Sequence, residues 1–110
     1  MVLALRAKLL TGEHAAAQSE RPPSASLEAY NDLLQGRFYQ SRETEADFRR
    51  AIESYTRATQ LDPSYALAWC ALAQVRTNLG SNFLEGAAAQ EAYAKAREAV
   101  ERALSLSRPS

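Results

Sequence analysis

The stretch AIESYTRATQLDPSYALAWCALAQ, residues 51–74, decides the fold that this sequence predicts. Ala51 and Ala58 lie two helical turns apart with Tyr55 between them, so the three side chains share one face of a helix. Methyl-sized side chains let two helix axes approach closely, and the larger ring fills the groove between them. The Asp-Pro pair that follows turns the chain, and a tryptophan begins the next helix. The stretch therefore predicts helices packed in antiparallel pairs.

Breakers and hydrophobic periodicity divide the chain into five predicted helices, and no stretch alternates as a strand would. Pro63 suits the first position of a helix with Asp62 as its N-cap, and Gly80 suits a left-handed cap at the end of that helix. The first two helices are expected at 2–10 and 27–40. A capping box that begins at Thr44 starts the third helix, which ends at residue 62. The fourth helix is expected at 63–80 and the fifth at 87–106. The predicted fold is all-α.

Apolar residues recur at helical spacing in these segments and predict which helix faces are buried. We expect a stripe in the helix at 27–40, another in the helix that follows Thr44, and a third at 87–106. These predicted stripes are Leu27, Tyr30, Leu34 and Phe38; then Phe48, Ile52, Tyr55 and Thr59; and lastly Ala89, Tyr93, Ala96, Val100, Ala103 and Leu104.

An internal repeat supports this pattern. AIESYTRATQL at 51–61 aligns with AREAVERALSL at 96–106, and both alanines, a glutamate, an arginine and the last leucine coincide. Tyr55 aligns with Val100, so an apolar residue lies between the alanines in both copies. Each copy has a proline shortly after it. The repeat predicts that one helix–turn–helix device occurs twice.

This pattern resembles the tetratricopeptide repeat, a helix–turn–helix unit of about 34 residues. Trp69, Leu72 and Ala73 fall on its W-x-x-L-G/A positions. The resemblance implies a superhelix of two repeats, at 27–63 and 64–109, that follow an N-terminal helical segment at 1–20. It also implies that the following residues pack between helices: Gly36, Ala51, Tyr55, Ala58, Pro63, Trp69, Leu72, Ala73, Gly80, Ala96, Val100 and Ala103.

The second repeat departs from the family pattern. Arg76 occupies a position where an aromatic residue is usual, and the stretch from Gly80 to Ala96 is longer than the family's turn. These departures put the regularity of the second repeat in doubt. The run at 27–73 also resembles the repeat region of multidomain bacterial signalling proteins, so the segment at 1–20 is expected to end a preceding domain.

Composition excludes several classes of function. The 110 residues include 13 Lys and Arg against 13 Asp and Glu, so no net charge attracts nucleic acid or an anionic membrane. No apolar run reaches the length of about 20 residues that a membrane-spanning helix needs. The single cysteine, Cys70, excludes an internal disulfide and favours a reducing, cytoplasmic location.

Candidate catalytic and metal-binding residues are few. His14 is the only histidine and has no cluster of cysteines or carboxylates around it, so no metal site is predicted. Cys70 has no CxxC partner and no basic neighbour that would activate it. Glu43, Glu45 and Asp47 are explained by the start of a helix, where negative charge is favourable. We therefore predict no enzymatic activity and no cofactor.

Binding is the function that the resemblance implies. The first helix of each repeat lines the concave side of such arrays, where ligands usually lie. A carboxylate clamp like that of some family members is not supported, because Cys70 and Gln74 occupy its second-repeat positions. An extended peptide or a partner helix fits the mixed polar and apolar surface. The concave candidates are Leu33, Arg37, Gln40, Ser41, Leu67, Cys70, Gln74, Thr77 and Asn78.

Two alternatives to peptide binding follow from the same residues. Helical arrays usually need three or more repeats for stability, so self-association, for example as a homodimer, would complete an array of two. The chain would otherwise be a regulatory fragment of a larger bacterial signalling protein, of the adenylate or guanylate cyclase or transcription regulator type.

Overall fold

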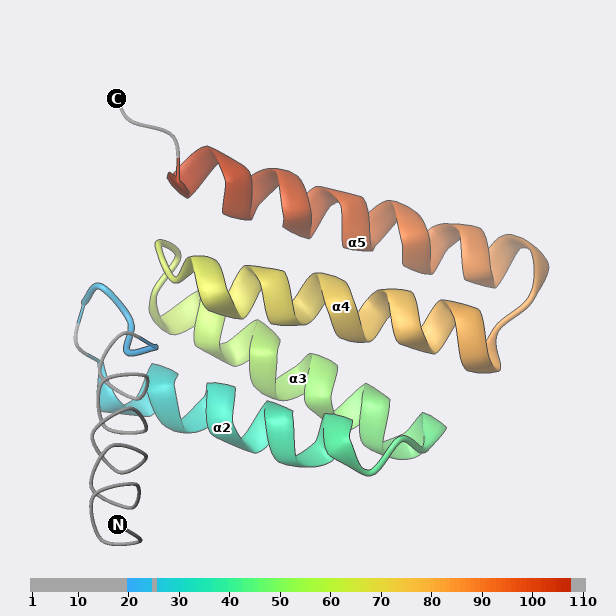
Figure 1. Ribbon diagram of the computed structural model, residues 1–110, viewed down its shortest axis with the longest axis horizontal. Coiled ribbons are helices and arrows are strands. Elements are labelled where there is room, and N and C mark those ends of the chain that lie inside the picture. Colours follow the sequence, from blue (N-terminus) through green and yellow to red (C-terminus); the bar gives the residue numbers. More distant parts are fainter. Residues whose placement is uncertain (1–19, 25, 108–110) are drawn as a thin grey trace, which may run out of the picture.

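The computed structural model describes residues 20–24 and 26–107, which form four helices joined by short turns (Figure 1). The helices are α2 (Leu27–Ser41), α3 (Glu45–Leu61), α4 (Ala66–Phe83) and α5 (Gly86–Ser107). These described residues contain no strand, which confirms the all-α prediction. The helix predicted at 2–10, together with His14, lies outside the described part of the chain.

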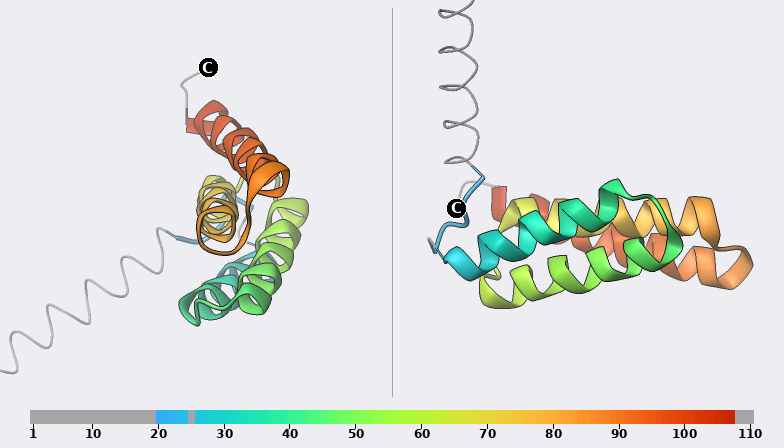
Figure 2. Two further views of the ribbon diagram at one scale, coloured as in Figure 1. Left: turned by 90° about the vertical axis from the view of Figure 1, so that its right-hand side faces the viewer. Right: turned by 90° about the horizontal axis from the view of Figure 1, so that it is seen from below.

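Each helix packs chiefly against its neighbours in sequence: α2 against α3, α3 against α4, and α4 against α5. Consecutive helices run antiparallel, and they follow one another as a zigzag rather than surround one centre (Figure 2). The smallest extent of the molecule, 22 Å, equals about two helix diameters. Because contacts are mostly between successive helices, this is the layered arrangement of a helical repeat.

The packing of α2 on α3 depends on a ring that lies against a glycine. A Cβ atom added to Gly36 would lie only 2.2 Å from Cε1 of Tyr55, so no side chain fits between them. Tyr55 is completely buried, and its hydroxyl donates a 2.7 Å hydrogen bond to Oε1 of Gln40 on α2. Ala51 and Ala58 are also completely buried. The small residues let the two helix axes come close around the aromatic ring.

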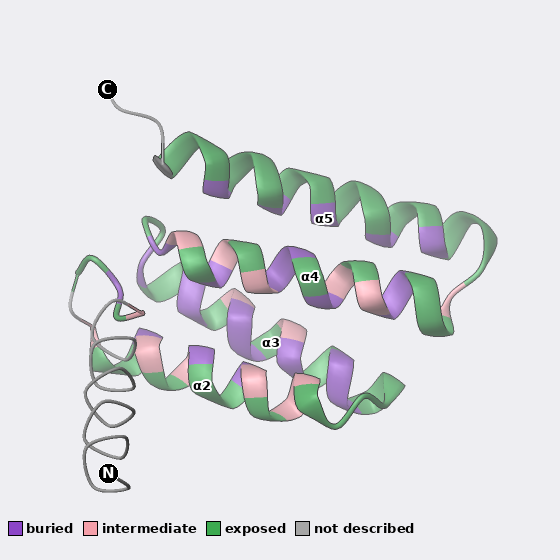
Figure 3. Cartoon of the chain, viewed as in Figure 1, coloured by how far each residue is buried: buried purple, intermediate pink, exposed green. Residues whose placement is uncertain are grey.

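Alanines serve the same purpose where α5 meets α4. Ala96, Ala99 and Ala103 are buried, and buried positions form a stripe on the side of α5 that faces α4 (Figure 3). Ala73 of α4 is buried as well. The buried residues that α5 contributes to this second helix pair are therefore alanines.

The structure confirms that Thr44 caps the N-terminus of α3. Oγ1 of Thr44 accepts a 3.0 Å hydrogen bond from the backbone N–H of Asp47, and the Thr44 hydroxyl donates back to the Asp47 carboxylate at 2.8 Å. Arg42 and Arg50 pair with the same carboxylate. The pKa of Asp47 is lowered by the Thr44 hydrogen bond, against the opposing effect of burial, and by the arginine charges.

The prediction that Asp62 and Pro63 start α4 is wrong. Asp62 follows the last residue of α3, and α4 begins only at Ala66. The Asp62 carboxylate accepts hydrogen bonds from the N–H and the hydroxyl of Ser64, so it closes a turn within the connection instead of capping a helix. It also accepts a 3.1 Å bond from the N–H of Ser24, which ties the segment before α2 to this turn.

The prediction that Gly80 ends α4 is also wrong, because the helix continues to Phe83. Gly80 is buried inside the helix, and a Cβ atom there would lie 2.9 Å from Cε1 of Tyr93 on α5. Its small size serves the packing of α4 on α5. The left-handed conformation occurs later, at Gly86, whose φ is +58°.

Two predicted stripes face the core only in part. On α2, Leu27, Leu34 and Phe38 are exposed, and the buried residues are Ala29, Leu33 and Gly36. The reason is that the buried side of α2 is the one that carries Ala29, Leu33 and Gly36, while Leu27, Leu34 and Phe38 lie on its outer side.

On α5 the alanines of the predicted stripe are buried, but the larger residues are not. Tyr93 is 36% exposed, Val100 43% and Leu104 52%. The prediction that Val100 packs between helices is therefore wrong. The alanine face of α5 covers α4, and no further helix among the described residues covers the opposite side.

Asp62 provides a test of the connection between α3 and α4. Burial would raise the pKa of this carboxyl, but the hydrogen bonds from Ser64 and Ser24 outweigh burial and lower the pKa. Because the pKa is lower in the folded state, the ionised carboxylate stabilises the folded protein above about pH 4. This stabilisation is lost as the pH falls through the pKa of the folded state. Asp62→Asn should cost about 1–3 kcal/mol at pH 7.

The measurement is urea unfolding of both proteins at pH 7 and at pH 3. We expect the difference in unfolding free energy between wild type and Asp62→Asn to shrink at pH 3. An unchanged difference would show that the ionised carboxylate does not stabilise this turn.

Candidate binding surface on α2 and α4

A shallow hollow of about 330 Å³ lies where the C-terminal half of α2 meets α4. It brings together five of the predicted binding residues from the two helices. Its full lining is Arg37, Gln40, Ser41, Glu43, Phe48, Gln74 and Asn78. We call this surface of α2 and α4 the inner face.

A second hollow of about 300 Å³ continues the inner face along α4 toward α5. It shares Gln74 and Asn78 with the first hollow, so the two form one continuous surface. Its full lining is Cys70, Ala73, Gln74, Thr77, Asn78 and Val100. Seven of the nine predicted binding residues therefore lie at one or both hollows.

The other two predicted binding residues lie elsewhere. Leu33 is completely buried in the core, so the prediction that it lines a binding surface is wrong. It faces α3 because the close approach at Gly36 turns that side of α2 inward. Leu67 is 37% exposed near the start of α4 and lines neither hollow.

Several polar groups of the inner face already have partners within the chain. Arg37 forms a 2.7 Å ion pair with Glu20, and this hydrogen bond raises the pKa of Arg37 against the effect of burial. Oε1 of Gln40 accepts from Tyr55, whose pKa burial raises to about 12. The hydroxyl of Tyr65 donates to the carbonyl oxygen of Glu20. These contacts restrict the side chains of Arg37 and Gln40, on the α2 side of the inner face.

Gln74 and Asn78 differ from these residues. Neither side-chain amide forms a hydrogen bond with the rest of the chain over residues 20–24 and 26–107. The hydroxyl of Thr77, between them in sequence, donates to the carbonyl of Ala73. A carboxamide carries both donors and an acceptor, so it can pair with the N–H and the C=O of an extended peptide. These two side chains are the best placed to bind one.

Four lining residues of the inner face were not predicted to line a binding surface. Phe48 was predicted to be core, and it does lie at the base of the hollow with 2% of its surface exposed. Ala73 and Val100 were assigned to packing. Glu43 lies in the turn between α2 and α3 with a left-handed φ of 57°, which is unusual for a non-glycine residue. The sequence analysis assigned Glu43 to the start of a helix, and no local pattern pointed to a place on a binding surface.

The described residues contain no group of three or more metal-ligating side chains. Cys70 is a free, exposed thiol. Among the described helices, none is both long enough and apolar enough to cross a membrane. The inner face therefore offers hydrogen-bonding amides and apolar contacts.

Residues 47–80 match the family described as TPR repeat. This part of the chain is a tetratricopeptide repeat. The match begins in α3, includes the turn at Asp62 and ends at Gly80 in α4, so it runs across residue 63, where the sequence predicts a boundary between two repeats. No curated protein and no solved structure shows significant similarity to the chain. Tetratricopeptide repeats generally bind proteins or peptides, which agrees with a surface of this composition.

Proposed function

We propose that this protein is a non-catalytic interaction module that binds an extended peptide of a partner protein on its inner face. The observation that carries the proposal is the pair of solvent-accessible amides, Gln74 and Asn78, which have no hydrogen-bond partner among the described residues and are shared by two adjoining hollows. A bound peptide backbone would occupy these amides, and its side chains would contact Phe48 or the apolar second hollow. Two repeats, at 27–63 and 64–109, would each contribute one helix to this surface.

Substitution of the two amides tests this proposal. A capped peptide selected against the protein from a random displayed library serves as the probe, and calorimetry measures its affinity. The double variant Gln74→Ala, Asn78→Ala should weaken binding at least about tenfold, because each lost hydrogen bond contributes about 1 kcal/mol. Gln90→Ala, which removes an exposed amide of α5 that lines neither hollow, is the matched control.

We expect the control to bind as the wild type does. Equal affinity of all three proteins would place the peptide elsewhere on the molecule, and failure to select any peptide would contradict the proposed function itself.

Self-association is a second candidate, and apolar side chains at both ends of the helix array favour it. In the register that aligns Gly36 with Ala73, Leu34 and Phe38 of α2 correspond to Ala71 and Val75 of α4. Val75 is completely buried, whereas Leu34 is 42% and Phe38 57% exposed. On α4 the equivalent surface is covered by the preceding helix, α3. On α2 this surface is left exposed.

The partly exposed residues Tyr93 and Val100, at the edge of the contact between α5 and α4, would supply the other half of such a contact. In the register that aligns Ala51 with Ala96, Tyr93 and Val100 of α5 correspond to Phe48 and Tyr55 of α3, which are buried. The two ends are therefore complementary, and α5 of one copy would pack on α2 of the next. Such a head-to-tail contact produces dimers and longer chains of molecules.

Sedimentation of variants tests the self-association. Phe38→Glu places a charge in the proposed contact surface of α2, and Val100→Glu places one in that of α5. Each variant alone should therefore be monomeric at concentrations where the wild type associates. An equimolar mixture should form dimers and nothing larger, because one intact α5 surface meets one intact α2 surface. A wild type that stays monomeric at high concentration, or a mixture that stays monomeric, would contradict the contact.

A regulatory role within a larger bacterial signalling protein, of the cyclase or transcription regulator type, is a third proposal. Its support is the resemblance of 27–73 to repeats of such proteins, and the exposed free thiol of Cys70 suits the cytoplasm that it implies. Determination of the coding sequence on both sides of this region would test it.

A further inference from the structure

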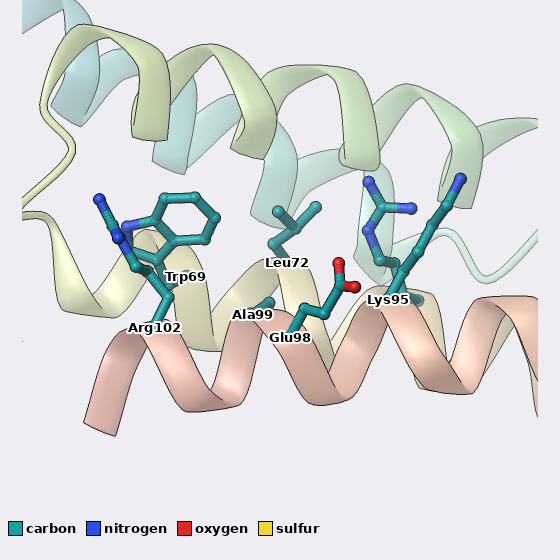
Figure 4. Close-up of a pocket in the computed structure, with 7 residues that line it drawn as sticks. Trp69, Leu72, Lys95, Glu98, Ala99 and Arg102 are labelled. Carbon is teal, nitrogen blue, oxygen red and sulfur yellow. The ribbon is translucent and has the colours of Figure 1, made fainter. Parts of the chain in front are cut away.

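A second, differently charged groove follows α4 and α5 on the side where α3 lies. It consists of two hollows, of about 430 Å³ and about 210 Å³, which share Arg76 and Lys95. Trp69 and Leu72 of α4 project to the same side as Lys95, Glu98 and Arg102 of α5 (Figure 4). We call this surface the basic groove. The lining of the larger hollow is Trp69, Leu72, Arg76, Lys95, Glu98, Ala99 and Arg102.

The basic groove carries more positive than negative side chains, although the whole chain is neutral. Its basic residues come from three helices, and its two acidic residues, Glu91 and Glu98, both come from α5. Glu91 pairs with Lys95 at 3.3 Å. The basic residues are Arg49, Arg76, Lys95 and Arg102. A ligand with negative charge would therefore be attracted to this part of the surface.

Arg76 is the central residue of the groove. It is partly buried, and its guanidinium forms no hydrogen bond or ion pair with the other described residues. Burial lowers its pKa, and the charge of Glu98 opposes this effect only from a distance. A guanidinium carries five N–H donors, so one without an acceptor in a partly buried place lacks the partner that such a group normally has. A carboxylate would supply it.

Trp69 gives the groove an apolar floor next to these charges. Its indole N–H donates a 2.9 Å hydrogen bond to the carbonyl oxygen of Pro63, which fixes the orientation of the ring. Arg102 lies over the ring at 5.8 Å from its centroid. Leu72, only 5% exposed, continues the floor toward Arg76. An apolar side chain of a ligand can therefore lie on Trp69 and Leu72 while a carboxylate reaches Arg76.

We propose that the basic groove is a second binding site, which takes a short acidic peptide segment with apolar side chains between its carboxylates. One carboxylate binds between Arg76 and Lys95, and the neighbouring apolar side chain packs on Leu72 and Trp69. The site is independent of the inner face, because it uses a different side of α4. A peptide fits better than a small phosphorylated ligand, since the groove is elongated and Glu91 and Glu98 would repel a dense charge.

The single tryptophan of the chain lies in this groove and reports binding directly. The probe is a capped peptide of alternating glutamate and leucine, and its analogue with glutamine is the control ligand. We expect a saturable change in Trp69 fluorescence with the glutamate peptide and none with the glutamine peptide at the same concentrations.

Arg76→Gln and Lys95→Gln should each weaken binding about tenfold or more, as the loss of a charged hydrogen bond does. Arg97→Gln makes the same change of charge at an exposed position of α5 outside the groove, and should bind as the wild type does. The double variant of the inner face, Gln74→Ala with Asn78→Ala, should also retain full affinity, which separates this site from the proposed peptide site.

Three results would overturn the proposal. No saturable change in fluorescence would exclude a site for such a peptide, and equal losses in Arg76→Gln and Arg97→Gln would indicate only nonspecific attraction. Displacement of the peptide by inorganic phosphate at an equal concentration would indicate a site for small anions instead. Circular dichroism of each variant confirms that the helices remain folded, so a loss of binding reports the groove.

Discussion

The contact between the Tyr55 ring and the backbone of Gly36 determines how the rest of the molecule is arranged. The ring of Tyr55 is completely buried against α2, and it fits there only because Gly36 has no side chain. The contact sets the distance between α2 and α3, and the hydrogen bond from Tyr55 to Gln40 fixes how far one helix is shifted along the other. The position of Gln40 on the inner face follows from the same contact.

The helix α4 lies at the centre of both surfaces because it packs on helices on two sides. Its contacts with α3 and α5 use Val75, Ala73 and Gly80, all buried, and leave two other strips of its surface accessible. One strip carries Gln74 and Asn78 and is nearly uncharged, whereas the other carries Trp69 and Arg76 next to the charges of α5. The two proposed binding sites therefore use two separate strips of a single helix.

The sequence predicted which helices form and pair more accurately than it predicted where they begin and end or which of their sides are buried. Capping at Thr44 was predictable because the side-chain hydrogen bonds are local to that turn. The true role of Asp62 was not, since it depends on Ser24, which is distant in sequence. Gly80 was assigned to a cap because its packing partner, Tyr93, lies on another helix. Leu33 was misplaced because period alone does not say which of two apolar faces turns to the core. The basic groove was not predicted because its residues come from three helices. Its only sign in the sequence was Arg76, at a position where the family usually has an aromatic residue.

Replacement of each of the two helical glycines by alanine tests the central contact most directly. Alanine favours a helix interior by about 1 kcal/mol over glycine at both positions. At Gly36 the new methyl group meets the immobile ring of Tyr55, so thermal melts should show Gly36→Ala destabilised by about 1–3 kcal/mol. At Gly80 it meets the ring of Tyr93, which is 36% exposed and can move aside, and the Cβ of Ala92 at 3.3 Å, so Gly80→Ala should be clearly less destabilised than Gly36→Ala. A Gly36→Ala protein that melts at or above the wild-type temperature would contradict the account.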